Sequence, residues 1–177
     1  MVSVELISGY QLRIGSGLDR AKLVKFMHKT YHELYPDREL GHLALTVEQY
    51  FSNKTPLWWV EWELLSGGAL EQGSGGAEEV KSNPVSQSPK IGCLWLGNAI
   101  DQVSGDRYSH IFLLYVDPEH RQRGIGSALV KQAENWARER GDRQIGLQVF
   151  LANKPALNLY QKLGYQTHSL SMLKSLD

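Results

Sequence analysis

The sequence predicts one domain built on a mixed α/β sheet. Stretches with the two-residue alternation of a β-strand are interleaved with stretches that have helical periodicity, which is typical of a layered α/β domain. The length of 177 residues, 42% of them hydrophobic, suits a single domain that buries its own core. We therefore expect one domain over residues 1–177, and each element follows from a local pattern.

The N-terminal part predicts one strand and two helices. Tyr10, Leu12 and Ile14 alternate as in a half-buried strand. A helix is expected over 16–35, because apolar residues recur there at helical spacing and Pro36 follows. A short second helix is expected over 46–52, because the letters TVEQ have the form of a capping box.

Two strands rich in β-formers follow, at 57–65 (LWWVEWELL) and 91–97 (IGCLWLG). Between them, residues 66–89 contain five glycines, five serines and two prolines. Such a segment is too polar and flexible to form core, so we interpret it as a hairpin insertion within the single domain. We assign the tryptophans of these strands to packing rather than to a ligand cage.

The C-terminal half predicts alternating strands and helices. Strands are expected at 108–116, 144–150 and 165–173, the first of them central because it is the most hydrophobic. An amphipathic helix is expected over 124–140, and another over 153–163, each followed by glycine.

Composition argues against several classes of protein. Lys plus Arg and Asp plus Glu both number 19, whereas a general nucleic-acid binder carries a basic excess. The longest apolar run, 111–116, is far shorter than the ~20 residues of a membrane span, and the N-terminus lacks signal-peptide features. Cys93 is the single cysteine, and the six histidines have no metal-ligand spacing, so we give His120 and the others apart from His110 no site role. We expect a cytoplasmic protein without a metal site.

One turn suggests an anion site. The residues Arg121-Gln122-Arg123-Gly124-Ile125-Gly126 stand where the helix after strand 108–116 begins. First-turn backbone N–H groups lack intrahelical partners, and glycines let a phosphate approach them. A helix start with surface arginines and tight glycine packing is the alternative. The turn lacks the third glycine of a dinucleotide fingerprint, and the chain has no Gly-Lys-Ser/Thr of a nucleoside triphosphate loop.

Two motifs in the correct order resemble those of the GNAT superfamily of acetyl-CoA-dependent N-acetyltransferases. The first is Val116-Asp117-Pro118 followed by the Arg121–Gly126 turn. The second has the form Asn-x-x-Ala-x-x-x-Tyr-x-x-x-Gly-Tyr, with Asn153, Ala156, Tyr160, Gly164 and Tyr165. The resemblance covers the chain from Ile91 onward by sequence and only by element order before that. It implies the GNAT fold, a mixed and mostly antiparallel sheet flanked by helices.

The resemblance also implies where acetyl-CoA binds. The diphosphate would lie on backbone N–H groups of the turn, and the pantetheine arm would pair with the end of the central strand, which carries a bulge in this superfamily. The residues implied in coenzyme binding are Leu114, Tyr115, Val116, Arg121, Gln122, Arg123, Gly124, Ile125, Gly126, Ser127, Asn153, Ala156 and Tyr160.

Acid and base candidates follow from the same resemblance. Tyr160 occupies the place of the superfamily's general acid, and the alternative is a core tyrosine with a satisfied hydroxyl. His110 is the first candidate for the general base, because several lineages carry a glutamate or histidine there. An inert histidine at a strand start is the alternative, and Glu33, Glu61 and Glu63 are rival bases. Cys93 is not expected to act as a covalent carrier.

The acceptor is expected against the end of the first helix, where Tyr31, Glu33 and Tyr35 would form an aromatic and acidic wall suited to a cationic amine. A solvated helix end is the alternative. We expect an N-acetyltransferase that moves acetyl from acetyl-CoA to a primary amine, of a small molecule or a protein, by direct attack in a ternary complex. The alternative function is a non-catalytic acyl-CoA sensor or scaffold. The acceptor, the acyl length and the oligomeric state stay open, although superfamily members are often homodimers.

Overall fold

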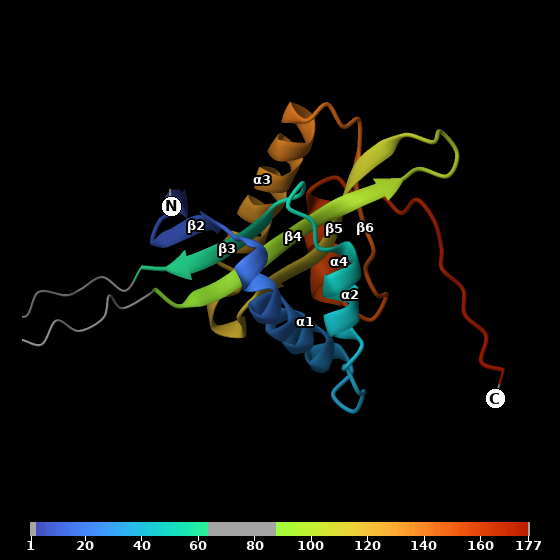
Figure 1. Cartoon of the computed structure of the whole chain (residues 1–177), viewed down its shortest axis with the longest axis horizontal. Coiled ribbons are helices and arrows are strands. Elements are labelled where there is room, and N and C mark those ends of the chain that lie inside the picture. The colour runs from blue at the N-terminus through green and yellow to red at the C-terminus, as the bar shows by residue number, and fades with distance from the viewer. Residues whose placement is uncertain (1–2, 64–87, 177) are drawn as a thin grey trace, which may run out of the picture.

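A computed structural model describes residues 3–63 and 88–176. Over these ranges the chain forms one six-stranded sheet with helices on both faces (Figure 1). The elements in chain order are β1 (Ser3–Ile7), β2 (Tyr10–Ile14), the one-turn 3-10 helix η1 (Gly17–Asp19), α1 (Arg20–Leu34), α2 (Leu43–Tyr50), β3 (Leu57–Trp62), β4 (Lys90–Ile100), β5 (Arg107–Val116), the one-turn 3-10 helix η2 (Pro118–His120), α3 (Ile125–Glu139), β6 (Ile145–Leu147) and α4 (Lys154–Lys162).

The sheet is mixed and mostly antiparallel, which confirms the expected fold class. Strands β1 to β5 pair antiparallel in chain order, and β6 alone pairs parallel, with β5. The longest ladder joins β4 to β5, from Gly92 opposite Val116 to Ile100 opposite Arg107. The expectation that residues 108–116 form the central strand is wrong, because β5 is the fifth of six strands and lies between β4 and the short β6. Its apolar composition instead reflects the helices on both faces, since it contributes Ile111 to one core and Leu113 to the other.

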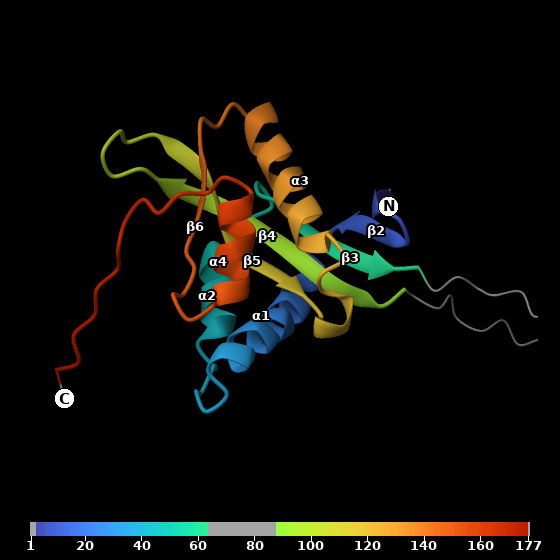
Figure 2. The ribbon, with the colours of Figure 1, turned by 180° about the vertical axis from the view of Figure 1, so that it is seen from behind.

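Two cores lie on the two faces of the sheet. Helices α1 and α2 cover one face and contribute Leu23, Phe26, Met27, Leu43 and Val47 to a core with Trp59 and Trp95. Helices α3 and α4 cover the other face (Figure 2) and contribute Ile125, Leu129, Val130, Ala133 and Tyr160 to a core with Tyr10, Trp58 and Leu94. The assignment of most tryptophans to packing is confirmed, since Trp58, Trp59 and Trp95 are buried.

Three elements differ between the sequence-based expectation and the structure. Strand β1 was not expected and pairs with β2. Helix α2 begins at Leu43, so Thr46 lies inside it; the Thr46 hydroxyl donates to the carbonyl of His42 at 3.4 Å instead of capping an N-terminus. The strand expected at 165–173 is absent, because residues 165–176 have no ladder partner within the described chain. A strand without a neighbour cannot satisfy its backbone groups through a ladder.

The remaining elements match expectation to within a few residues at most ends. The shortest is β6, which covers 145–147 where a strand over 144–150 was expected. The predicted insertion at 66–89 lies outside the described residues except for Ser88 and Pro89. Pro89 closes the ladder between β3 and β4, since its carbonyl accepts from the N–H of Trp62 at 3.1 Å.

Candidate functional site

The turn between β5 and α3 presents free backbone donors. Gln122 has φ 60° and Gly124 has φ 86°, so the chain is left-handed at both positions before α3 begins. No side chain caps α3, and the first helical bond runs from the N–H of Ala128 to the carbonyl of Gly124 at 3.0 Å. The backbone N–H groups of residues 122–127, which we call the amide cradle, thus have no acceptor in the described parts of the chain. The N–H of Arg121 is already used by the carbonyl of Pro118 at 3.2 Å.

The cradle can bind an anion for two reasons. Its donors lie at the positive end of the dipole of α3, a helix of 15 residues. A Cβ at Gly124 would meet nothing within 4 Å, so the space in front of this residue is open. The predicted Ser127 lies in the first turn of the same helix.

The second motif packs α4 against the cradle. A Cβ at Gly126 would lie 3.3 Å from Cδ2 of Leu159, so glycine allows the close approach of α3 and α4. Asn153 caps α4, because its side-chain oxygen accepts from the N–H of Ala156 at 3.2 Å. Asn153 and Ala156 therefore act locally as a helix cap, which orients the helix that carries Tyr160.

The two arginines of the turn are directed to different faces of the sheet. Arg121 donates through Nε to the carbonyl of Val116 and through Nη2 to both carboxylate oxygens of Glu33 on α1, each at 2.8 Å. Arg123 donates to the hydroxyl of Tyr10, in the α3/α4 core, and to the carbonyl of Glu119, each at 3.1 Å.

Beyond residue 111, β5 has a free edge. The strand pairs with β6 only through Ser109 to Ile111, opposite residues 145–147. Its other ladder shifts register at Phe112, because Trp95 faces Leu113 while Leu96 faces Ile111. This is the expected bulge, two residues before the predicted pantetheine-binding segment 114–116. That segment keeps β4 as its neighbour on one side and has no strand on the other, so its edge can pair with an extended ligand.

Tyr160 is suited by its environment to hold a proton. Its side chain is 9% exposed and belongs to the α3/α4 core, with its ring 5.6 Å from that of Tyr165. Burial raises the pKa of Tyr160 to about 12. The phenol therefore stays protonated at neutral pH and can donate.

His110 is half-buried on β5 and lies opposite Gly97 and Gly146 on its two neighbouring strands. Its ring contacts Phe112, which packs into the α1/α2 core, at a centroid distance of 5.1 Å. The predicted base and the predicted acid thus lie on opposite faces of the sheet. Burial lowers the pKa of His110, so the imidazole is neutral at pH 7 and able to accept a proton.

The predicted acceptor wall is partly assembled around a residue that the sequence did not suggest. The rings of Tyr31 and Tyr35 lie 6.2 and 5.4 Å from the ring of Phe150, which follows β6. Phe150 is 41% exposed, unusually open for an aromatic side chain beside two others. The one available signal was its place at the end of a predicted strand. Glu33 stands between the two tyrosines in sequence and is ion-paired with Arg121.

The rival groups have other partners or surroundings. Glu61 forms ion pairs with Arg13 and Lys90, each at 3.3 Å, and Glu63 is an exposed residue just after β3. Cys93 is fully buried, and burial raises the pKa of its thiol, which disfavours the thiolate.

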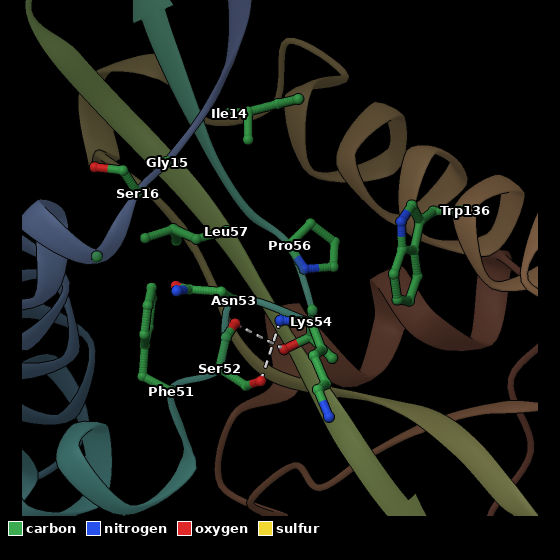
Figure 3. A pocket seen from close by; sticks show the side chains of 12 residues that line it. Ile14, Gly15, Ser16, Phe51, Ser52, Asn53, Lys54, Pro56, Leu57 and Trp136 are labelled. Atoms are coloured by element: carbon green, nitrogen blue, oxygen red, sulfur yellow. Dashed lines mark hydrogen bonds between the residues drawn. The ribbon is translucent and has the colours of Figure 1, made fainter.

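A surface hollow of about 430 Å³ lies between the end of β2, the segment joining α2 to β3, and Trp136 of α3 (Figure 3). None of the predicted site residues lines it. Within residues 3–63 and 88–176 no group of His, Cys, Asp and Glu could hold a metal ion, and no helix is long and apolar enough to cross a membrane.

Comparison with known proteins gives concordant results. Residues 86–165 match the model of the acetyltransferase (GNAT) family. An N-acetyltransferase of Methanocaldococcus jannaschii is 35% identical over 88 residues, which cover 50% of this chain and 37% of that protein. Thialysine N-epsilon-acetyltransferase of Bos taurus is 43% identical over 53 residues, 30% of this chain and 31% of that protein. The alignments thus span well under half the length of these relatives.

Solved structures show the same fold. AAC(6')-Iy, in complex with the bisubstrate analogue CoA-S-monomethyl-acetylneamine, superimposes with a TM-score of 0.61 at 14% identity, over 96% of this chain and 99% of that one. The family match runs through β4, β5 and α3 to Tyr165, so it contains both motifs, the amide cradle and the free edge of β5. On this evidence residues 86–165 match the acetyltransferase (GNAT) family, and the chain as a whole is similar in fold to solved acetyltransferases.

Proposed function

We propose that the protein transfers an acetyl group from acetyl-CoA to a primary amine by direct attack in a ternary complex. The observation that carries the proposal is the amide cradle beside the free edge of β5. The cradle supplies donors for a diphosphate, and residues 114–116 supply an edge along which the pantetheine arm extends.

Coenzyme binding uses backbone more than charge. The N–H groups of residues 122–127 converge on one helix terminus, where the oxyanions of a diphosphate replace the missing intrahelical acceptors. Arg123 is held beside the cradle and adds positive charge, because within the described residues two of its donor groups are engaged and the others can reach a ligand. Arg121 is occupied by Glu33 and Val116, so its predicted contribution requires a change of partner.

The reaction needs one proton removed and one supplied. The amine nitrogen attacks the thioester carbonyl carbon, the C–N bond forms, and collapse of the tetrahedral intermediate breaks the C–S bond. His110, neutral because burial lowers its pKa, takes the proton that the amine loses. Tyr160, protonated because burial raises its pKa to about 12, supplies the proton that the departing thiolate takes up. His110 and Tyr160 lie on opposite faces of the sheet, so they can act on opposite sides of a thioester that is bound along the free edge of β5.

We expect the acceptor to be a cationic amine that binds against aromatic rings. The rings of Tyr31, Tyr35 and Phe150 gather at the end of α1, and Glu33 adds a carboxylate once Arg121 has changed partner. Aromatic faces and a carboxylate both favour ammonium groups. The similarity to a thialysine N-epsilon-acetyltransferase supports the choice of an amine acceptor.

The test measures thiol release from acetyl-CoA with a panel of amines: lysine, thialysine, a polyamine, an aminoglycoside and a peptide with a free N-terminus. We expect amine-dependent release with at least one of them. The matched control is Tyr160→Phe, which keeps the ring and removes the proton donor. Coenzyme binding without release over the whole panel would instead support a non-catalytic acyl-CoA sensor, and absence of coenzyme binding would refute both functions.

A further inference from the structure

At the turn that carries the amide cradle, Tyr10 meets two side chains that are more than 100 residues away in sequence. The hydroxyl of Tyr10 lies 3.0 Å from Nδ1 of His120, and Nη1 of Arg123 donates to the same hydroxyl at 3.1 Å. Tyr10 is 5% exposed and His120 is 8% exposed, so water screens this cluster little. Neither Tyr10 nor His120 belongs to the motifs that indicated the coenzyme site.

The direction of each hydrogen bond follows from the chemistry of the groups. A guanidinium only donates, so the oxygen of Tyr10 is the acceptor for Arg123. The Tyr10 hydrogen then has Nδ1 of His120 as its acceptor, and no other partner for it exists in the described chain. This pattern of donors assigns the ring proton of His120 to Nε2. The opposite tautomer would place two donors on Tyr10 and leave its own hydrogen buried without an acceptor.

Contacts with two aromatic rings of the sheet fix the position of the His120 imidazole. Tyr10 and Trp62 are direct cross-strand neighbours on β2 and β3. The His120 ring packs at 5.7 Å from the Tyr10 ring, 89° between planes, and at 5.1 Å from the Trp62 ring, 63° between planes. Edge-to-face contacts of this kind fix orientation as well as distance.

The cluster fixes the cradle's turn at two points. His120 stands before the left-handed residue Gln122, and Arg123 follows it. A left-handed conformation costs about 1 kcal/mol or more for a residue with a Cβ, so a free turn would relax away from it. The bonds to Tyr10 hold both flanks of that residue. Arg123 is further fixed by its bond to the carbonyl of Glu119 at 3.1 Å.

We propose that Tyr10 and His120 are positioning residues for the coenzyme diphosphate: they hold the turn at residues 120–124 open for the anion and aim Arg123 toward it. This inference rests on the proposed function. A turn that is ordered before binding spares the ligand the cost of ordering it, so loss of the cluster weakens binding of the part of the coenzyme that the turn contacts.

The test compares two ligands that share the pantetheine arm. Tyr10→Phe keeps the ring in the core and removes the bridging hydroxyl. Dissociation constants are measured by NMR titration with CoA and with pantetheine, which lacks the diphosphate. We expect about 10-fold weaker binding of CoA, about 1.4 kcal/mol, and unchanged binding of pantetheine. Tyr50→Phe removes a hydroxyl on α2 that makes no hydrogen bond in the described structure, and it should change neither constant.

Two further measurements separate positioning from general stability. In a double-mutant cycle, Tyr10→Phe and Arg123→Met should lose less CoA affinity together than the sum of their separate losses, because they break one cluster. In the wild-type protein, long-range ¹H–¹⁵N spectra should show the Nε2–H tautomer of His120.

The outcomes are distinguishable. Unchanged CoA affinity in Tyr10→Phe, an equal loss for both ligands, full additivity in the cycle, or a proton on Nδ1 would each overturn the inference and leave the proposed function standing. A wild-type protein that does not bind CoA would overturn both.

Discussion

Substitution of Gly124 by glutamate tests the amide cradle most directly. Gly124 caps α3 with φ 86°, and a Cβ there would meet nothing within 4 Å, so the new side chain would enter the open space in front of the free amides. The backbone strain of a non-glycine residue at this φ is about 1–2 kcal/mol. For a domain of this size such a loss lowers Tm by about 2–8 °C.

The effect on binding is much larger than the effect on folding. A carboxylate on the order of 5 Å from one charge of the diphosphate, at an effective dielectric constant of about 20, costs about 3 kcal/mol. That energy corresponds to a loss of affinity of about 100-fold or more. Gly124→Gln is the matched control, because it brings the same strain and almost the same volume without the charge.

The assay is titration calorimetry with CoA, together with thermal melts of both variants. We expect the two variants to melt within about 2 °C of each other, and Gly124→Glu to bind far more weakly than Gly124→Gln. Equal affinities for the two variants would show that the diphosphate does not lie at this helix terminus, and the reasoning from free amides would be refuted.

Three other predictions concern catalysis and stability. Tyr160→Phe should lower kcat by about 100-fold while the Kd of CoA changes little, measured by thiol release and calorimetry, because proton donation acts only in the transition state; an unchanged kcat would remove Tyr160 from the mechanism. Burial lowers the pKa of His110, so the acidic limb of the pH–rate profile should lie below the ordinary histidine range, and His110→Asn should abolish that limb. Burial acts to raise the pKa of Asp142, but hydrogen bonds from Arg140 at 2.7 Å and Ser109 at 2.5 Å outweigh it, so the net shift is downward. Because the pKa of Asp142 is lower in the folded than in the unfolded protein, the ionised carboxylate stabilises the fold at any pH above its unfolded-state pKa, and this stabilisation is lost as the pH falls through the folded-state pKa. Asp142→Asn should therefore lower the free energy of unfolding by about 2 kcal/mol at pH 7 and by almost nothing in strong acid. Urea denaturation at the two pH values measures the difference.

Periodicity and local motifs predicted most of the fold. The alternation in β2 and the helical pattern of α3 were sufficient there, because each of these elements buries one regular face. The strands β3 and β4 were predicted from their many β-formers, and both have runs of consecutive buried residues. The helix start predicted from the letters TVEQ was wrong, because a capping box works only at the position where a helix begins. This helix begins at Leu43, three residues before Thr46. The prediction of a strand over 165–173 was wrong for a different reason. Alternation is a property of a single segment, whereas a strand also needs a neighbouring strand to pair with.

The candidate site divides in the same way. The amide cradle was predictable because adjacent residues determine its geometry: two glycines stand at the start of a helix. Phe150 beside Tyr31 and Tyr35, and Tyr10 beside His120, could not be predicted, since contacts between residues more than 100 positions apart depend on the register of the whole sheet. The pairing of Glu33 with Arg121 likewise joins two residues that the sequence had assigned to different ligands.

The bulge at Phe112 has a consequence for insertions and deletions in β5. Ile111 belongs to the α3/α4 core, whereas Leu113 belongs to the α1/α2 core, so the odd-numbered positions of this strand change sides at residue 112. Removing this single residue would restore a regular pleat and shift the phase of one half of the strand. The side chains of either His110 or residues 114–116 would then point to the opposite face of the sheet. We therefore expect deletion of residue 112 to abolish the proposed acetyl transfer, although the composition of the chain hardly changes.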